Sequence, residues 1–208
     1  MEWVIPLQKL EVSKIQTGGF MNGIKPLAPL APLHYMDGET HFPSLSLLLP
    51  SLIVKVYEPN TGKLILSLKD SASSTNKLQA LQASLLSYVH TNQGAWFNQG
   101  RRDLAELQQL FQPMVEGDML HLYCPVSVQD KKSGGVDSIV VYRSEKGGPV
   151  IGSQGVRPTF LQPGDSVRVC LRIQGISFHN HPIHGEWTGR FRLQHKIIAL
   201  YINSKGGA

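Results

Sequence analysis

Five cations alternate with apolar residues along two segments near the end of the chain. The first segment, residues 167–174, reads VRVCLRIQ, and the second, residues 190–202, reads RFRLQHKIIALYI. Because side chains alternate between the two faces of a strand, each segment predicts a strand with one apolar face and one basic face. The basic face would carry Arg168, Arg172, Arg190, Arg192 and Lys196. Like charges on neighbouring strands are unfavourable, so this pattern indicates a polyanion bound over the face.

Aromatic residues near these segments could supply the second component of a nucleic-acid site. Single-stranded nucleic acid is held by cations that follow the phosphates and by rings on which the bases stack. The stacking candidates are Phe178 and Trp187 in the connecting loop, and Tyr142, which lies beside Arg143 on an earlier strand. Every base has a stacking face, so such a site would tolerate many sequences. The alternative for the two loop rings is packing that closes the end of the domain.

The same connecting loop, FHNHPIHGEW, carries three histidines within six residues. His179, His181 and His184 could hold Zn²⁺, with Glu186 as a fourth ligand or as a base for metal-bound water. The spacing matches no established zinc signature, and Pro182 restricts the shape of the loop. We therefore expect polar loop residues that contact phosphate, with no bound metal or cofactor. Metal-dependent hydrolysis stays open as an alternative.

Other signatures of catalysis are missing from the sequence. The segment GGPVIGSQG lacks the Lys-Ser/Thr ending of a phosphate-binding loop, and no GxSxG motif occurs. Neither cysteine stands in a recognisable nucleophile context, and the acidic residues are scattered. We therefore expect a binding protein and not an enzyme.

The excess positive charge is confined to the last quarter of the chain. The net charge is +5; residues 1–156 hold 13 Lys and Arg against 13 Asp and Glu, whereas residues 157–208 hold 7 against 2. Localised positive charge is typical of nucleic-acid-binding proteins, and a solvated basic surface without a partner is the alternative.

Composition also bears on the cellular compartment. The two cysteines, Cys124 and Cys170, provide no disulfide framework and indicate a reducing environment. No apolar run approaches the roughly 20 residues that cross a bilayer, and MEWVIPLQKLEV lacks the basic start of a secretory signal. We expect an intracellular protein of the cytoplasm, nucleus or a viral factory, neither secreted nor bound to a membrane.

Sequence periodicity divides the chain into an arm and a β-rich domain. Residues 1–50 contain KPLAPLAPLHYM, whose prolines favour an extended path, so we expect an arm laid over the domain or reaching a neighbouring subunit. Residues 51–208 alternate as strands, beginning with a hairpin over 52–57 and 64–69 whose turn contains Gly62.

A helical insertion at about 76–112 interrupts the strands. Helical spacing of leucines predicts one helix over 77–90, with Thr75 or Asn76 as its N-cap, and a second over 102–112. Between the helices lie two rings that we expect to pack in the core, Trp96 and Phe97. Five to seven strands with two inserted helices predict an α+β fold, mainly β, built on a small OB-like barrel.

In layout the chain resembles the OB-fold single-stranded DNA-binding proteins of phages and large DNA viruses. The resemblance covers residues 45–203: the hairpin LIVKVYEPNTGKLILSL, an inserted helical segment, then LQPGDSVRVCLRIQGISF and WTGRFRLQHKIIALYI. It implies that one barrel face binds DNA through cations and stacked rings, here Arg168, Arg172, Arg190, Arg192, Lys196 and Trp187. Such proteins often end in an acidic tail that recruits replication partners. This chain ends NSKGGA, so recruitment of that type is not expected.

Three functions are compatible with these observations. The leading hypothesis is single-stranded DNA binding with little sequence preference, in replication, recombination or repair; DNA and RNA are not distinguished. The first alternative is a structural protein, such as a minor capsid component, in which residues 1–50 join the subunits of a homo-oligomer. The second is the metal-dependent hydrolase that uses the histidine loop.

Overall fold

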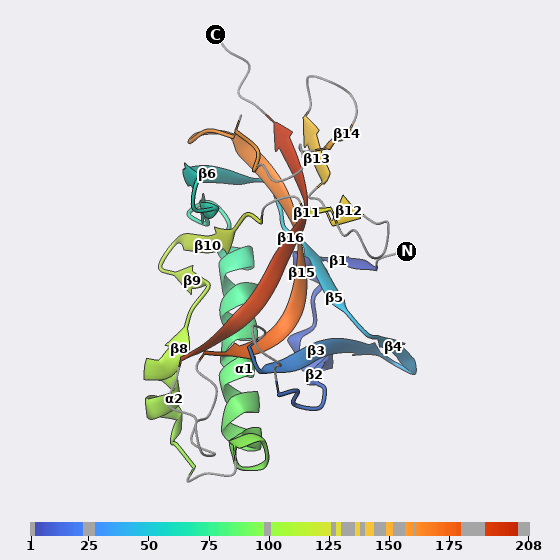
Figure 1. Ribbon diagram of the computed structural model, residues 1–208, viewed down its shortest axis with the longest axis vertical. Coiled ribbons are helices and arrows are strands. Elements are labelled where there is room, and N and C mark those ends of the chain that lie inside the picture. Colours follow the sequence, from blue (N-terminus) through green and yellow to red (C-terminus); the bar gives the residue numbers. More distant parts are fainter. Residues whose placement is uncertain are drawn as a thin grey trace.

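The computed structural model places a large sheet against one long helix (Figure 1). It describes residues 3–22, 28–97, 101–125, 157–159, 161–179 and 190–203, and only the backbone of the strands at 128–129, 136–137, 140–143 and 149–151. Within this part of the chain, 14 strands form a single sheet and two more, β11 (Val128–Gln129) and β12 (Val136–Asp137), form a separate pair.

The sheet is open. Its main path runs β14-β13-β16-β15-β6-β7-β10-β9, and the two end strands do not pair with each other. The bounds are β6 (Leu52–Glu58), β7 (Lys63–Ser67), β9 (Val115–Glu116), β10 (Met119–Tyr123), β13 (Val140–Arg143), β14 (Pro149–Ile151), β15 (Ser166–Phe178) and β16 (Phe191–Asn203). The mainly β, α+β class is confirmed, but the predicted OB-like barrel is wrong. On its outer edge β16 pairs at its two ends with β8 (Phe111–Gln112) and with β13, and the stretch between these pairings faces β10 without a backbone ladder.

The two segments with alternating cations form the longest strands of the sheet. Strands β15 and β16 have 13 residues each and pair antiparallel along their whole length. The register shifts twice, so that Gln174 on β15 and Ile198 on β16 have no partner residue opposite. Each shift is a β-bulge, which exchanges the two faces of the strand beyond it.

The N-terminal segment, predicted as an extended arm, contributes strands to the sheet of its own chain. Strand β5 pairs with β15 through Leu45–Leu48, and the start of β3 pairs with β15 at Gly175–Ser177. Gly175 permits this approach, because a Cβ there would collide with the carbonyl oxygen of Ala31. The elements are β1 (Val4–Pro6), η1 (Leu7–Lys9), η2 (Val12–Lys14), β2 (Ile15–Thr17), β3 (Leu30–Asp37), β4 (Thr40–Phe42) and β5 (Leu45–Leu48).

The extended backbone that proline-rich segments share with β-strands explains why the sequence predicted an arm where the structure has paired strands. Closely spaced prolines favour extended backbone, and a β-strand is extended as well. The decisive signal is the alternation of apolar side chains, because Ala31, Leu33 and Tyr35 on β3, like Leu45 and Leu47 on β5, are all buried. Burial of these side chains stabilises strands that the prolines alone do not specify.

The helical insertion is confirmed, with different boundaries. Helix α1 (Ala72–Phe97) begins before the predicted N-cap residues and includes TNQGAWF, which was expected to be a loop. Helix α2 (Leu104–Leu110) begins with a capping box, in which Asp103 Oδ1 accepts a hydrogen bond from Glu106 N and Glu106 Oε2 accepts one from Asp103 N.

The core lies between α1 and the sheet, and one end of it is aromatic. Leu78, Leu81, Leu85 and Val89 of α1 are fully buried together with the inward-facing apolar residues of β15 and β16. Rings from α1, β15, β16 and the segment after β2 meet at one end of the core, namely Phe20, Trp96, Phe97, Phe178 and Phe191. The expected packing role of the two α1 rings is therefore confirmed. No helix in the described residues is long and apolar enough to cross a membrane.

One buried amide ties α1 to the edge of the sheet. Oε1 of Gln82 accepts hydrogen bonds from the backbone N–H groups of Met114, at 2.7 Å, and Val115, at 3.0 Å. We expect Gln82→Leu to lower the free energy of unfolding by about 2–4 kcal/mol, because two buried N–H groups lose their acceptor while side-chain volume and helix propensity hardly change. Urea unfolding followed by circular dichroism measures the loss.

The matched control is Gln79→Leu, on the exposed side of the same helix. This variant should unfold at nearly the wild-type urea concentration. Equal stability of the two variants would contradict a stabilising role for the Gln82 amide.

Candidate nucleic-acid interface

The predicted cations of β15 and β16 lie on the face turned away from the core. Arg172 is paired with Lys196, so their side chains share a face, and both are half-buried. Arg168 and Arg192 are exposed on the same face, whereas Val167, Val169, Leu171 and Ile173 on the other face are buried. We call the set Arg168, Arg172, Arg190, Arg192 and Lys196 the basic face.

In the described part of the chain, no carboxylate is paired with the exposed arginines of the basic face. Neither β15 nor β16 contains an acidic residue. Among the described residues, the ion pairs involve other cations, namely Lys14, Lys63 and His121. Arg168, Arg190 and Arg192 therefore present positive charge to an anionic ligand, with no carboxylate partner among the described residues.

Arg190 extends the basic face by one residue pair beyond the strands. The backbone N–H of His179 donates to the carbonyl oxygen of Arg190 at 2.6 Å, which continues the ladder past Phe178 and Phe191. Burial, and then the nearby charge of Arg192, lower the pKa of His179. The neutral imidazole lies among arginines, and its Nε2 atom has no hydrogen-bond partner in the described residues.

The proposed zinc ligands cannot be assembled from the described part of the chain. His181, His184 and Glu186 lie outside the described residues, as does Trp187. Within the described residues, no group of three His, Cys, Asp or Glu side chains has the spacing to hold a metal ion.

Phe178 is not a stacking platform, which corrects the sequence prediction. Its ring is fully buried, with the Phe97 ring 4.9 Å away and the Phe191 ring 5.8 Å away, measured between centroids. The cause is the bulge at Gln174. Uninterrupted alternation would place Phe178 on the basic face, and the extra residue turns it into the core.

The bulge at Ile198 acts in the opposite sense and exposes a ring that the sequence analysis missed. Tyr201 is paired with Arg168 and is 45% exposed, although simple alternation would bury it. Tyr142 and Arg143 lie on β13 in register with Tyr201 and Ile202, and their side chains are outside the described part of the structure. Recognising this ring would have required locating the bulge.

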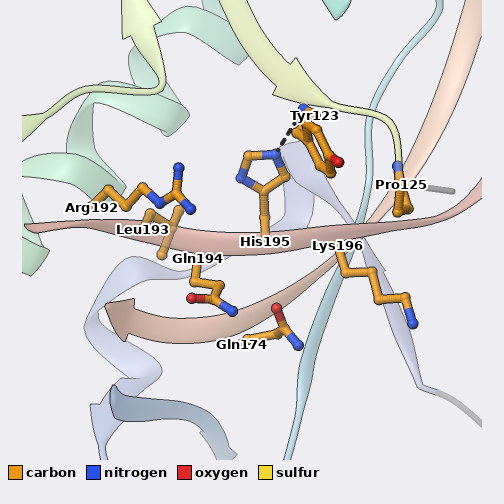
Figure 2. A pocket seen from close by; sticks show the side chains of 8 residues that line it. All are labelled: Tyr123, Pro125, Gln174, Arg192, Leu193, Gln194, His195 and Lys196. Atoms are coloured by element: carbon orange, nitrogen blue, oxygen red, sulfur yellow. Dashed lines mark hydrogen bonds between the residues drawn. The ribbon is translucent and has the colours of Figure 1, made fainter. Parts of the chain in front are cut away.

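A hollow of about 390 Å³ adjoins the basic face at the unclosed side of the sheet. Here β16 runs between its pairing with β8, which ends at Arg192, and its pairing with β13, which begins at Ala199. The end of β10 faces this stretch, as Figure 2 shows. We call this space the seam hollow; its lining residues are Tyr123, Pro125, Gln174, Arg192, Leu193, Gln194, His195 and Lys196.

His195 bridges the gap between β10 and β16. Its Nε2 atom accepts a hydrogen bond from the backbone N–H of Tyr123 at 3.3 Å (Figure 2). Burial, reinforced by the charge of Arg192 and partly opposed by the backbone of Leu193, lowers the pKa of His195 to about 4. A neutral imidazole thus takes the place of the backbone ladder that would close a barrel.

Comparison with known proteins adds no relative. No protein-family model matches the sequence, and no curated protein is detectably similar to it. The layout resemblance to OB-fold single-stranded DNA-binding proteins therefore stays a prediction, carried by the residues of the chain alone.

The bridge at His195 should make stability depend on pH. The folded pKa of about 4 lies below the ordinary value of 6.5, so the unfolded chain binds more protons between these pH values and stability falls as pH drops from 6.5 to 4. We expect the wild type to lose up to about 3 kcal/mol more than His195→Gln across this window. Urea unfolding of both proteins at several pH values measures the difference, and parallel curves would contradict it.

Proposed function

We propose that this protein binds single-stranded DNA with little sequence preference and supports replication, recombination or repair. The observation that supports this most directly is the basic face, on which Arg168, Arg190 and Arg192 are exposed and have no carboxylate partner among the described residues. Cations arranged along paired strands can follow a phosphate backbone, which carries a negative charge at every nucleotide.

Exposed rings beside the cations favour a single strand over a duplex. Tyr201 is about half exposed next to Arg168, and Tyr123 is 49% exposed at the seam hollow. Unpaired bases can stack on such rings, whereas the bases of a duplex already stack on one another. Stacking also accounts for the proposed tolerance of sequence.

The other functions receive less support from the same geometry. The N-terminal strands pair with β15 of their own chain, so the segment expected to join subunits is used within the monomer. Homo-oligomerisation and the hydrolase based on His181 and His184 stay predictions.

Titration with a fluorescent oligonucleotide at several salt concentrations tests the proposal. We expect the affinity of the wild type to fall steeply with salt, because bound cations release counterions from DNA. The double variant R168A/R192A should weaken binding for all sequences and reduce the slope of log affinity against log salt by about 1.4.

The matched control is Lys9→Ala, which removes an exposed cation from η1, on the side of the sheet that carries α1. This variant should bind as the wild type does. Absence of binding at low salt, or equal loss in the control and the double variant, would exclude the basic face as a DNA site.

A further inference from the structure

The chemistry of the seam hollow differs from that of the basic face beside it. Two amides, Gln174 and Gln194, line it together with an imidazole and the Tyr123 ring. Figure 2 shows the two amides close to each other on one side of β16, and Tyr123 with His195 on the other. A ligand in this space meets amide donors and acceptors and an aromatic surface, in addition to the charges of Arg192 and Lys196, which also line it.

His195 is a neutral, hydrogen-bonded side chain at the base of the hollow. Because Nε2 accepts from Tyr123, the neutral imidazole carries its proton on Nδ1. Nδ1 is buried and is turned toward Arg192 in Figure 2. The Leu193 backbone lies near this imidazole and the exposed Arg192 guanidinium is open to solvent, so Nδ1 is a buried donor with at most one weak acceptor from its own strand.

The Tyr123 ring is held in place at the edge of the hollow. Arg157 donates from Nη2 to the Tyr123 hydroxyl at 2.6 Å, and its guanidinium carbon lies 5.2 Å from the ring centroid. Arg157 is itself fixed by the carbonyl oxygens of Cys124, Pro59 and Asn60. A ring positioned in this way can receive a planar ligand without losing conformational freedom.

An added β-strand does not fit this space. Two strands that accept a third between them must stand roughly 9.5 Å apart. The His195 side chain instead spans the gap and reaches within 3.3 Å of the Tyr123 backbone. A peptide strand would have to displace the imidazole, whereas a compact planar group can lie beside it.

We propose that the seam hollow binds one base of a single-stranded DNA while the basic face holds the neighbouring phosphates. This inference rests on the proposed function and identifies the base as the part of the nucleotide that the hollow binds. The amides of Gln174 and Gln194 hydrogen-bond the base edge, and the Tyr123 ring and the His195 imidazole border the base from the other side of the hollow. The volume of about 390 Å³ lies in the range of roughly 300–1,000 Å³ typical of small-ligand pockets.

The test compares an oligonucleotide with an abasic strand of the same length, which keeps every phosphate but offers no base. We expect the wild type to bind the normal strand about tenfold more tightly or better. The double variant Q174A/Q194A should shrink this ratio severalfold and leave the affinity for the abasic strand unchanged. Both glutamines are partly exposed, and thermal unfolding verifies that the variant is folded.

A matched control separates the hollow from other base contacts. The double variant Q108A/Q109A removes two exposed amides from α2 and should keep the wild-type ratio. An unchanged ratio in Q174A/Q194A, with affinity retained, would overturn the base pocket and leave the proposed function standing. If neither strand binds the wild type at low salt, the proposed function itself fails.

Discussion

The antiparallel ladder between β15 and β16 is the interaction on which the rest of the fold depends. Strands β3, β5 and β6 are hydrogen-bonded to one edge of this pair, and β8 and β13 to the other. Its inner face supplies core residues from Val167 to Ile202, and its outer face supplies the basic face. The same alternation of side chains therefore stabilises the fold and concentrates the charge.

Simple alternation predicted part of this arrangement and failed at identifiable places. From 167 to 173 and from 190 to 197 each side chain lies on the expected side, and the helical insertion is where leucine spacing put it. The bulges at Gln174 and Ile198 leave no mark in composition. Phe178 therefore lies in the core and Tyr201 is exposed, the reverse of what simple alternation predicts. The pairing of the N-terminal segment within the sheet was not predicted, because proline spacing is equally compatible with a free extended chain and a paired strand. The seam hollow depends on contacts between residues far apart in sequence, which periodicity does not reveal.

At the unclosed side of the sheet, a buried and neutral imidazole takes the place of a backbone ladder. A ladder there would satisfy backbone groups at low cost, but it would also fill the space between β10 and β16. The imidazole of His195 satisfies the Tyr123 N–H with a single side chain and leaves the adjoining space open. Neutrality of that imidazole matters, because a further positive charge beside Arg192 would be unfavourable.

The pairing of early strands with late ones has a consequence for biosynthesis. A ribosome makes Leu47 long before its partner Leu171, and Ala31 long before Ile176. Until the last quarter of the chain emerges, the apolar residues of β3, β5 and α1 lack the surface that covers them. Completion of the sheet thus waits until β15 and β16 have been synthesised, and until then the exposed apolar residues favour aggregation of the nascent polypeptide.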